Sequence, residues 1–422
     1  MDFTLPPDDD PRRLEIRVWL DTHPHPDRAT LAAGGFIAPH WPGPWGRDAD
    51  AVTQLIIDDE FHRAGIRIPG ASIGVGWAGP TILAGGTQAQ KERFLPPMLD
   101  NTEDWCQLFS EPEAGSVLAS LRTRAVRDGG NYIVNGSKIW STRADVTDWG
   151  ILLVRTSDIG PPQKGISYLL LDMTTPGIEV RPIVEMTGGH HFNETFLTNV
   201  EIPVENLVGT ENEGWRLAKV TLANERVSLS QGGVLWGRGP DDPAVLARIR
   251  ELGCEDPILR QRVADLYTEM AVLRLLNQRV MSAQLTGGDP GPLSSIRKAI
   301  GDKHGQKAMA LVKDLEGPST MLDGHYPYEE DEDLWAWGHY FSRALTIGGG
   351  TSEVQRNIIG ERLLGLPREP RPCPFLNATL KRPRETGDNR CPTIPDSTSS
   401  STCGSSAMAT SWSSPSTSPM TT

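Results

Sequence analysis

The hydrophobic pattern of the chain changes period twice, which limits the folds that it can adopt. From about Pro11 to Asn101 apolar residues recur at helical spacing. From about Trp105 to Val208 short apolar runs alternate with Gly, Pro and Asp clusters, as strands and turns do. From Gly214 the helical spacing returns. This succession predicts a multidomain α+β protein with an N-terminal helical domain, a central antiparallel β-barrel or sandwich, and a C-terminal helical bundle.

The domain boundaries follow from these changes. We expect domains over residues 1–103, 104–208 and 209–368, followed by a tail over residues 369–422. The tail mixes proline with basic residues and then becomes rich in serine and threonine. Because such a composition buries too little apolar surface to offset chain entropy, we predict that the tail is disordered. Its abrupt start would also fit an altered reading frame or a fusion scar.

Local signals predict several details. Thr87 is the expected N-cap of a helix over Gln88–Leu99 that Pro96-Pro97 would close. Asn135-Gly136 is the strongest hairpin signal of the central region. The segment Gly74–Gly79 matches the dinucleotide-binding pattern G-x-G-x-x-G, but no strand-like run precedes it. We therefore interpret its glycines as helix-packing or loop positions.

Charge and composition exclude several classes of protein. The 41 basic and 54 acidic residues give a net charge of −13, which argues against nucleic-acid binding. No apolar stretch approaches the ~20 residues of a membrane-spanning helix, and no signal peptide is visible. The histidine pairs, His190-His191 and His23-x-His25, lack a third metal ligand. We expect a soluble cytoplasmic protein without a metal site.

Three segments far apart in the sequence carry the groups expected of a binding site: Cys106–Ser116 (CQLFSEPEAGS), Asn135–Thr142 (NGSKIWST) and Thr346–Asn357 (TIGGGTSEVQRN). The first is an extended run entering a Pro/Gly turn, with free backbone N–H groups and serine hydroxyls. The second has an aromatic ring and a hydroxyl two residues apart, on one side of a strand. The third is a glycine loop that opens a helix, a cradle for electron-rich groups. Each alone could equally be a structural turn.

Together the three segments resemble the acyl-CoA dehydrogenase family. The family signature Thr-Glu-Pro-x-Ala-Gly-Ser-Asp corresponds to Ser110–Val117, and Asn-Gly-x-Lys-x-Trp-Ile-Thr corresponds to Asn135–Thr142. The family's Glu-Gly-Thr-x-x-Ile-Gln-Arg corresponds to Gly349–Arg356. The resemblance extends from about Leu31 to Arg368, and the helical, β, helical order is also the family's architecture.

The resemblance implies that FAD lies between the β domain and the C-terminal helices. Trp140 would stack on the flavin ring, Thr142 would approach N5, and Ser110 would donate to the pyrimidine side. Ser116 would meet the CoA moiety of the substrate. The full set of cofactor residues that the resemblance implies is Gln107, Leu108, Phe109, Ser110, Trp140, Ser141, Thr142, Thr351 and Glu353.

The family's reaction removes a proton α to a thioester, which needs a carboxylate in a dry pocket. Most members carry this Glu immediately before the Gly-Thr of the third segment, where this chain has Gly349. In branched-chain members the base comes from a C-terminal helix in a Leu-x-x-Glu-Arg context, which Leu222–Arg226 matches. By this resemblance Glu225 is the base, Arg226 lies near the thioester or CoA, and the Gly349 N–H polarises the thioester carbonyl. The alternative is that Glu225-Arg226 is an ordinary surface pair.

The absence of a loop glutamate also suggests free volume beside the acyl chain, and hence a bulky or branched acyl group such as a steroid side chain. The implied activity is FAD-dependent oxidation of an acyl-CoA to a 2-enoyl-CoA by a homo- or hetero-oligomer. An electron-transfer flavoprotein would be the acceptor.

Three departures from the family pattern keep other functions open. Val117 replaces the signature Asp, no Arg-x-x-Phe-Gly element is found between Arg248 and Pro257, and the usual Gly-Gly-x-Gly is reduced to Glu316–Pro318. One alternative is a non-catalytic or half-site subunit of a heteromeric dehydrogenase. The other is a different flavin reaction on the same fold, such as oxygenation.

Overall fold

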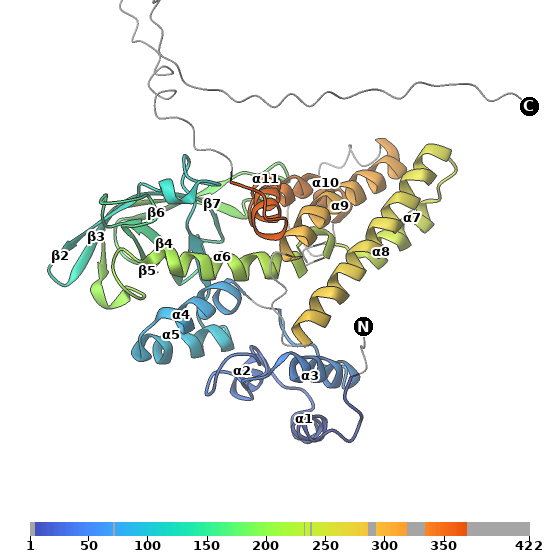
Figure 1. Ribbon diagram of the computed structural model, residues 1–422, viewed down its shortest axis with the longest axis horizontal. Helices are drawn as coiled ribbons and strands as arrows, with labels where there is room; N and C mark the ends of the chain where they lie inside the picture. The colour runs from blue at the N-terminus through green and yellow to red at the C-terminus, as the bar shows by residue number, and fades with distance from the viewer. Residues whose placement is uncertain are drawn as a thin grey trace, which may run out of the picture. The chain divides into compact units, whose positions relative to one another are not determined.

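The computed structural model describes residues 5–70, 72–231, 233–236, 239–285, 293–318 and 334–368. Helices form both ends of this described chain and strands form its middle, so the predicted helical, β, helical order is confirmed (Figure 1). The tail predicted over residues 369–422 lies outside the described residues.

The N-terminal part consists of helices, which are α1 (Pro11–Thr22), α2 (Arg28–Ala33), α3 (Ala51–Arg63), the π-helix η1 (Gly74–Ala78), α4 (Gly79–Gly85) and α5 (Gln88–Asp100). Thr87 caps α5 through a capping box with Gln90, as predicted. The helix does not end at Pro96-Pro97, however, but continues to Asp100. The burial of Phe94, Leu95, Met98 and Leu99 on one face offsets the hydrogen bonds that the prolines remove.

Gly79 confirms the packing interpretation of the segment Gly74–Gly79. A Cβ atom at Gly79 would lie 2.2 Å from the ring of Trp41, so only glycine allows this approach. The segment forms η1 and the start of α4 and does not follow a strand. It is therefore not a dinucleotide-binding loop of the βαβ type.

The middle part is one sheet of seven strands, β1 (Trp105–Leu108), β2 (Arg124–Asp128), β3 (Asn131–Thr142), β4 (Trp149–Arg155), β5 (Ile166–Asp172), β6 (Ile178–Ile183) and β7 (Phe192–Pro203). The strand order is β1-β4-β2-β3-β7-β6, and β5 also pairs with β4. Strand β4 runs parallel to β1 and β2, whereas the other pairs are antiparallel.

The prediction of an antiparallel barrel or sandwich is therefore wrong in two respects. The sheet is mixed, and among the described strands its outer members do not pair with each other, so it stays open. The turn signals in the sequence indicate where strands begin and end, but they do not determine which strands pair.

The predicted hairpin at Asn135-Gly136 is also wrong. The β2–β3 turn lies at Asp128–Asn131, and Asn135-Gly136 falls inside β3, at a register shift against β7. A Cβ atom at Gly136 would lie 2.7 Å from Thr123 Cα. The glycine thus serves a close backbone approach rather than a turn.

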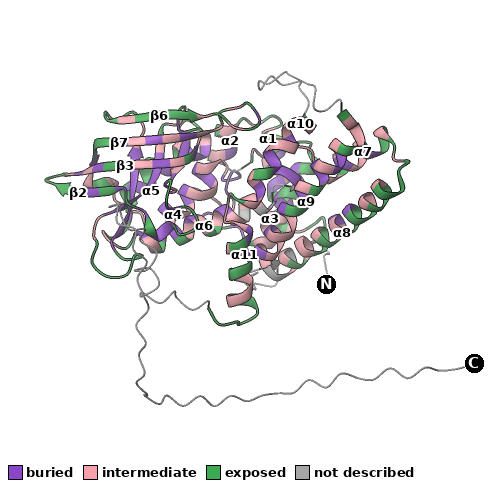
Figure 2. Ribbon diagram, turned by 90° about the horizontal axis from the view of Figure 1, so that it is seen from above, coloured by how far each residue is buried: buried purple, intermediate pink, exposed green. Residues whose placement is uncertain are grey.

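The C-terminal part contains α6 (Gly214–Gln231), α7 (Asp242–Leu252), α8 (Pro257–Leu285), α9 (Leu293–Glu316), α10 (Leu334–Phe341) and α11 (Ser352–Ile358). Short 3₁₀ or π segments accompany the strands and helices: η2 (Leu118–Ser120), η3 (Val204–Asn206), η4 (Gly233–Leu235), η6 (Ser342–Thr346) and η7 (Ile359–Leu363). Figure 2 shows α8 largely pink and green, and Leu266 and Met270 are the buried apolar residues among its described side chains.

Helix α6 contacts all three parts of the molecule. It packs against η1 and α4, against β5 of the sheet, and against α9 (Figure 1). Buried hydroxyl groups fix it in place: Thr221 of α6 lies 2.8 Å from Thr81 and 3.1 Å from Tyr168, measured between their oxygens. These bonds fix the Thr221 position of α6 between α4 and β5.

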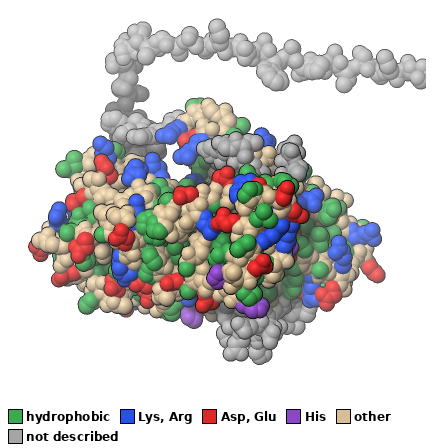
Figure 3. All heavy atoms as spheres, turned by 90° about the horizontal axis from the view of Figure 1, so that it is seen from below, with side chains coloured by type: hydrophobic (Ala, Val, Ile, Leu, Met, Phe, Trp, Pro, Cys, Tyr) green, Lys and Arg blue, Asp and Glu red, His purple; other side chains and the backbone are tan. Residues whose placement is uncertain are grey.

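The surface has mixed charge. Figure 3 shows acidic and basic side chains interspersed over the face drawn. None of the helices in the described part of the chain combines the length and apolar character needed to cross a membrane.

Candidate active site

The first two sequence segments lie side by side. Strand β1 carries Gln107, and the chain continues through the buried Leu108 and Phe109 to Ser110. The carbonyl oxygen of Ser110 accepts a hydrogen bond from the backbone N–H of Ile139 at 2.9 Å. This bond places Ser110 beside the part of β3 that carries Trp140.

A buried ion pair joins the same two segments. Lys138 donates to Glu111 at 2.8 Å and to the Phe109 carbonyl at 3.2 Å, while Glu111 also accepts from the backbone N–H groups of Arg122 and Thr123. Burial lowers the pKa of Lys138 to about 8. Burial opposes ionisation of Glu111 as well, but the Lys138 charge holds the Glu111 pKa below its usual value. Neither residue was predicted to have a role, although opposite charges in two adjoining motifs were the available signal.

Trp140 has an unusual backbone conformation. Its φ of 63° is rare for a bulky residue, and it lies at a register shift between β3 and β7. The indole is 55% exposed and meets Phe192 edge to face, whereas Ser141 is buried and Thr142 is half-buried. The irregularity thus presents an aromatic ring to solvent, a form of strain that clusters at ligand sites.

Glu225 lies on α6 and is 9% exposed. The side-chain amide of Gln107 donates to its carboxylate, with 3.3 Å between Nε2 and Oε2. Burial raises the pKa of Glu225, and the Gln107 hydrogen bond and the charges of Lys298 and Arg226 oppose this rise. Glu225 is therefore not part of an ordinary surface pair. The group is a desolvated carboxylate, as a general base requires.

The glycine loop before α11 needs its glycines. Gly349 and Gly350 have φ values of 65° and 91°, in the region that favours glycine. A Cβ atom at Gly349 would lie 2.7 Å from Leu229 Cδ1 and 2.9 Å from Lys298 Cε. At the glycine itself the space is taken by the ends of the Leu229 and Lys298 side chains.

Two polar residues shape the end of this loop. The hydroxyl of Thr351 caps α11 by accepting from the Val354 N–H at 3.3 Å. The buried Gln355 amide donates to the carbonyls of Gly349 and Gly350 at 3.1 and 3.2 Å. Gln355 belongs to the third segment, but no role was predicted for it.

Two of the remaining predicted residues, Ser116 and Glu353, are not joined to this centre. Ser116 is exposed, and Glu353 is exposed and pairs with Arg356 of its own helix at 3.9 Å. Arg226 is half-buried next to Glu225, and burial lowers its pKa. Among the described residues, no hydrogen bond or ion pair connects Ser116 or Glu353 to Glu225 or Gln107. No three His, Cys, Asp or Glu side chains of the described chain gather into a possible metal site.

Three family models match consecutive parts of the chain. They are the N-terminal, middle and C-terminal domains of acyl-CoA dehydrogenase, which match residues 12–102, 106–200 and 212–364. The chain belongs to the acyl-CoA dehydrogenase family. The matched ranges cover the helical, β and helical parts described above, so the resemblance seen in the three motifs is confirmed.

Two similar proteins come from Mycobacterium tuberculosis. Acyl-CoA dehydrogenase FadE34 of that organism is 43% identical over 341 residues, which are 81% of this chain but 46% of that protein. This chain thus spans about half the length of FadE34. Acyl-CoA dehydrogenase IpdE1 of the same organism is 36% identical over 80% of this chain and 87% of its own length.

Solved structures share the fold. The ChsE4-ChsE5 complex from Mycobacterium tuberculosis is similar with a TM-score of 0.68 and 32% identity, covering 87% of this chain and all of that one. The Tcur3481-Tcur3483 steroid ACAD gives a TM-score of 0.69 and 28% identity over the same shares.

Acyl-CoA dehydrogenases are generally FAD-dependent oxidoreductases, and the site fits such a cofactor. Trp140 presents a ring for stacking. The hydroxyl of Ser141 and the side-chain oxygen of Gln355 are buried without a hydrogen-bond partner in the described part of the chain. Buried polar atoms of this kind usually have a partner, so they can serve a polar ligand.

Proposed function

We propose that this chain catalyses the α,β-dehydrogenation of an acyl-CoA thioester to a 2-enoyl-CoA, with Glu225 as the base. One observation carries the proposal: Glu225 is a buried carboxylate, tied by Gln107 to the strand that leads to Ser110 and the Trp140 segment. A carboxylate with a raised pKa can accept a proton from a weakly acidic carbon near neutral pH.

The residues of this chain have separate tasks in the reaction. Glu225 takes the proton from the carbon α to the thioester, and Gln107 holds its carboxylate in place. The Gly349 N–H would polarise the thioester carbonyl, which stabilises the negative charge that develops as the proton leaves. FAD, when bound, supplies the acceptor for the hydride from the β carbon.

The residues that would hold FAD come from all three segments. Gln107 to Ser110 and Trp140 to Thr142 would contact the flavin, and Thr351 and Glu353 the rest of the dinucleotide. The exposed indole of Trp140 and the unpaired Ser141 hydroxyl support this assignment. Ser116 and Arg226 are proposed contacts of the CoA moiety, with Arg226 offering a cation beside the base.

The substrate class follows from the relatives. A related solved structure is described as a steroid ACAD, and relatives are named acyl-CoA dehydrogenases. We propose a CoA thioester with a bulky, steroid-like acyl part, and an electron-transfer flavoprotein as the electron acceptor. This substrate does not depend on free volume at Gly349, where Leu229 and Lys298 lie.

The assembly of the similar solved structures favours a second function. The two solved structures named above each pair two different chains, ChsE4 with ChsE5 and Tcur3481 with Tcur3483. This chain could be the half-site subunit of such a heteromer. Val117, which stands at the signature Asp position, is 70% exposed and offers no charge to a ligand.

An absorbance spectrum of the purified full chain tests both functions. The first predicts a yellow protein whose flavin absorbance bleaches on anaerobic addition of a steroid-side-chain CoA thioester. Glu225→Gln should remain yellow but should not bleach. A chain that is colourless alone and yellow only after co-expression with a homologous partner would support the heteromer, and bleaching of Glu225→Gln at the wild-type rate would refute Glu225 as the base.

A further inference from the structure

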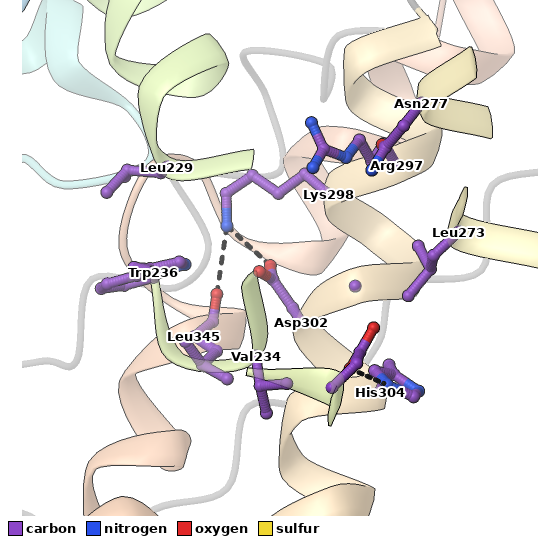
Figure 4. A pocket seen from close by; sticks show the side chains of 12 residues that line it. Leu229, Val234, Trp236, Leu273, Asn277, Arg297, Lys298, Asp302, His304 and Leu345 are labelled. Carbon is purple, nitrogen blue, oxygen red and sulfur yellow. Dashed lines mark hydrogen bonds and ion pairs between the residues drawn. The ribbon is translucent and has the colours of Figure 1, made fainter. Parts of the chain in front are cut away.

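Lys298 is a buried cation that the proposed reaction does not yet use. It lies on α9 and is 2% exposed. Its ammonium donates to Asp302 Oδ2 at 2.6 Å and to the Leu345 carbonyl oxygen at 3.1 Å (Figure 4). It also lies 5.4 Å from the centre of the Trp236 ring. Because burying an ammonium group is costly without such partners, these contacts hold the side chain in one place.

Because Lys298 is held in one place, it can anchor the glycine loop. Leu345 lies in η6, three residues before Gly348, so its bond to Lys298 ties the approach to the glycine loop onto α9. At Gly349 an added Cβ atom would meet Lys298 Cε at 2.9 Å, and at Gly348 it would meet the Trp236 ring at 2.6 Å. The loop is thus packed directly against the stem of Lys298 and the indole of Trp236.

The placement of Lys298 also affects Glu225. Leu229 lies one turn after Glu225 on α6 and touches the Gly349 position together with Lys298. The same ammonium therefore stands near the α6 face that carries the base. Burial raises the pKa of Glu225, and the Lys298 charge is one of the influences that oppose the rise.

Few other ionisable groups around α6 are placed to act as a charge beside Glu225. The elements η1 and α4 carry no ionisable side chain, and β5 contributes Tyr168, which binds Thr221, and Asp172, which binds Thr174 in a turn. On α6 itself, Arg226 is the cation next to Glu225. On α9, Arg297, Asp302 and His304 line the same cavity as Lys298. Burial raises the pKa of Asp302 to about 6, and the charge of Lys298 and its hydrogen bond oppose this rise.

We infer that Lys298 is a positioning residue of the active site: anchored by Asp302, it holds the Gly348–Gly350 loop in place and supplies the fixed positive charge on the α9 side of Glu225. The inference rests on the proposed role of Glu225 as the base. The lysine stem lies 2.9 Å from the place that a Cβ atom would take at Gly349, so a side chain there would have to displace it.

The test is an infrared titration of the Glu225 carboxyl group in the full chain as purified, which does not depend on turnover. The band of interest is the one that Glu225→Gln lacks. Lys298→Met removes the charge but keeps the shape of the stem, so the titration midpoint should rise by about one pH unit. Lys303→Met removes a charge from the exposed side of the same helix and should leave the midpoint unchanged.

A second variant, Asp302→Asn, distinguishes an effect of the Lys298 charge on the midpoint from an effect of lost structure. Asp302→Asn breaks the same ion pair but keeps the ammonium, so the midpoint should stay or fall. If both variants raise the midpoint alike, or if Lys298→Met leaves it unchanged, the inference is wrong. Should Lys298→Met fail to fold, the double variant Lys298→Met/Asp302→Leu removes both charges without an unpaired carboxylate and should again raise the midpoint.

Failure of the proposed function would give different results from failure of the Lys298 inference. A chain that never bleaches with acyl-CoA would overturn the dehydrogenase proposal, but a midpoint raised by Lys298→Met and not by Asp302→Asn would still establish the charge coupling. In an active enzyme, the acid limb of the kcat/KM profile should follow the infrared midpoint in each variant.

Discussion

The side-chain amide of Gln107 donates a hydrogen bond to Glu225 Oε2 across 3.3 Å, from the first strand of the sheet to the first helix of the C-terminal part. This bond joins a residue of the first sequence segment to the proposed base, which lies more than a hundred residues later. It stabilises the ionised carboxylate, because an amide N–H is a better partner for the charged form than for the neutral form.

Gln107→Met should therefore raise the pKa of Glu225. The base must be ionised to act, so the acid limb of kcat/KM should move to higher pH by up to about one unit, and the rate should recover at alkaline pH. The measurement is the pH profile of acyl-CoA oxidation. Gln88→Met, which removes an exposed amide that donates to Glu92, is the control and should keep the wild-type profile.

Glu225→Gln should lower kcat by at least about 10²–10⁴-fold while raising stability at neutral pH. In the folded state the Glu225 pKa is raised, so between its usual value near 4.5 and the raised value the folded state holds a proton that the unfolded state has released. Wild-type stability therefore falls as pH rises through this window, by about 1.4 kcal/mol for each unit of pKa elevation.

Urea unfolding at several pH values checks this second effect. The variant lacks the pH-dependent loss, so it should be more stable than the wild type at pH 8 and equally stable below the usual glutamate pKa. Equal stability at every pH would show that Glu225 is not held in a desolvated site.

Much of this arrangement was predictable because it depends on local patterns. Period changes located the three parts of the fold, and the resemblance of Leu222–Arg226 and of the glycine loop to branched-chain acyl-CoA dehydrogenases indicated Glu225. The buried position of Glu225 on α6 agrees with that assignment. Such features survive in sequence because each needs particular residue types at a fixed spacing.

Long-range pairing was not predictable in the same way. The parallel pairing of β1 with β4 depends on contacts between segments over forty residues apart, and turn signals do not encode it. The Asn135-Gly136 pair has the composition of a turn, but tertiary packing against Thr123 places it inside β3. Lys298 likewise has no motif that marks it, since its role arises from the meeting of α9 with the glycine loop.

Lys138→Met should destabilise the protein by about 3–5 kcal/mol, because it leaves the buried Glu111 carboxylate without its cation. The double variant Lys138→Met/Glu111→Gln should recover much of this loss, since no unpaired charge remains. Urea unfolding measures both. Arg124→Met breaks an exposed pair with Asp158 and should cost at most about 1 kcal/mol. A similarly small effect of Lys138→Met would contradict the role of the pair in joining the two segments.

The crowded space around Gly349 limits where the catalytic base can reside. Gly349→Ala should cost more stability than Gly253→Ala, although both glycines have φ values near 70°. The space around Gly253 is open, so its substitution measures the backbone cost alone, whereas a methyl group at Gly349 would overlap Leu229 and Lys298. We expect an extra ~1–3 kcal/mol for Gly349→Ala in urea unfolding. For the same reason, a carboxylate placed at this position in Glu225→Gln/Gly349→Glu should not restore activity. Recovery of a substantial part of the wild-type rate by this double variant would show that the loop can carry the base and that α6 is not its required location.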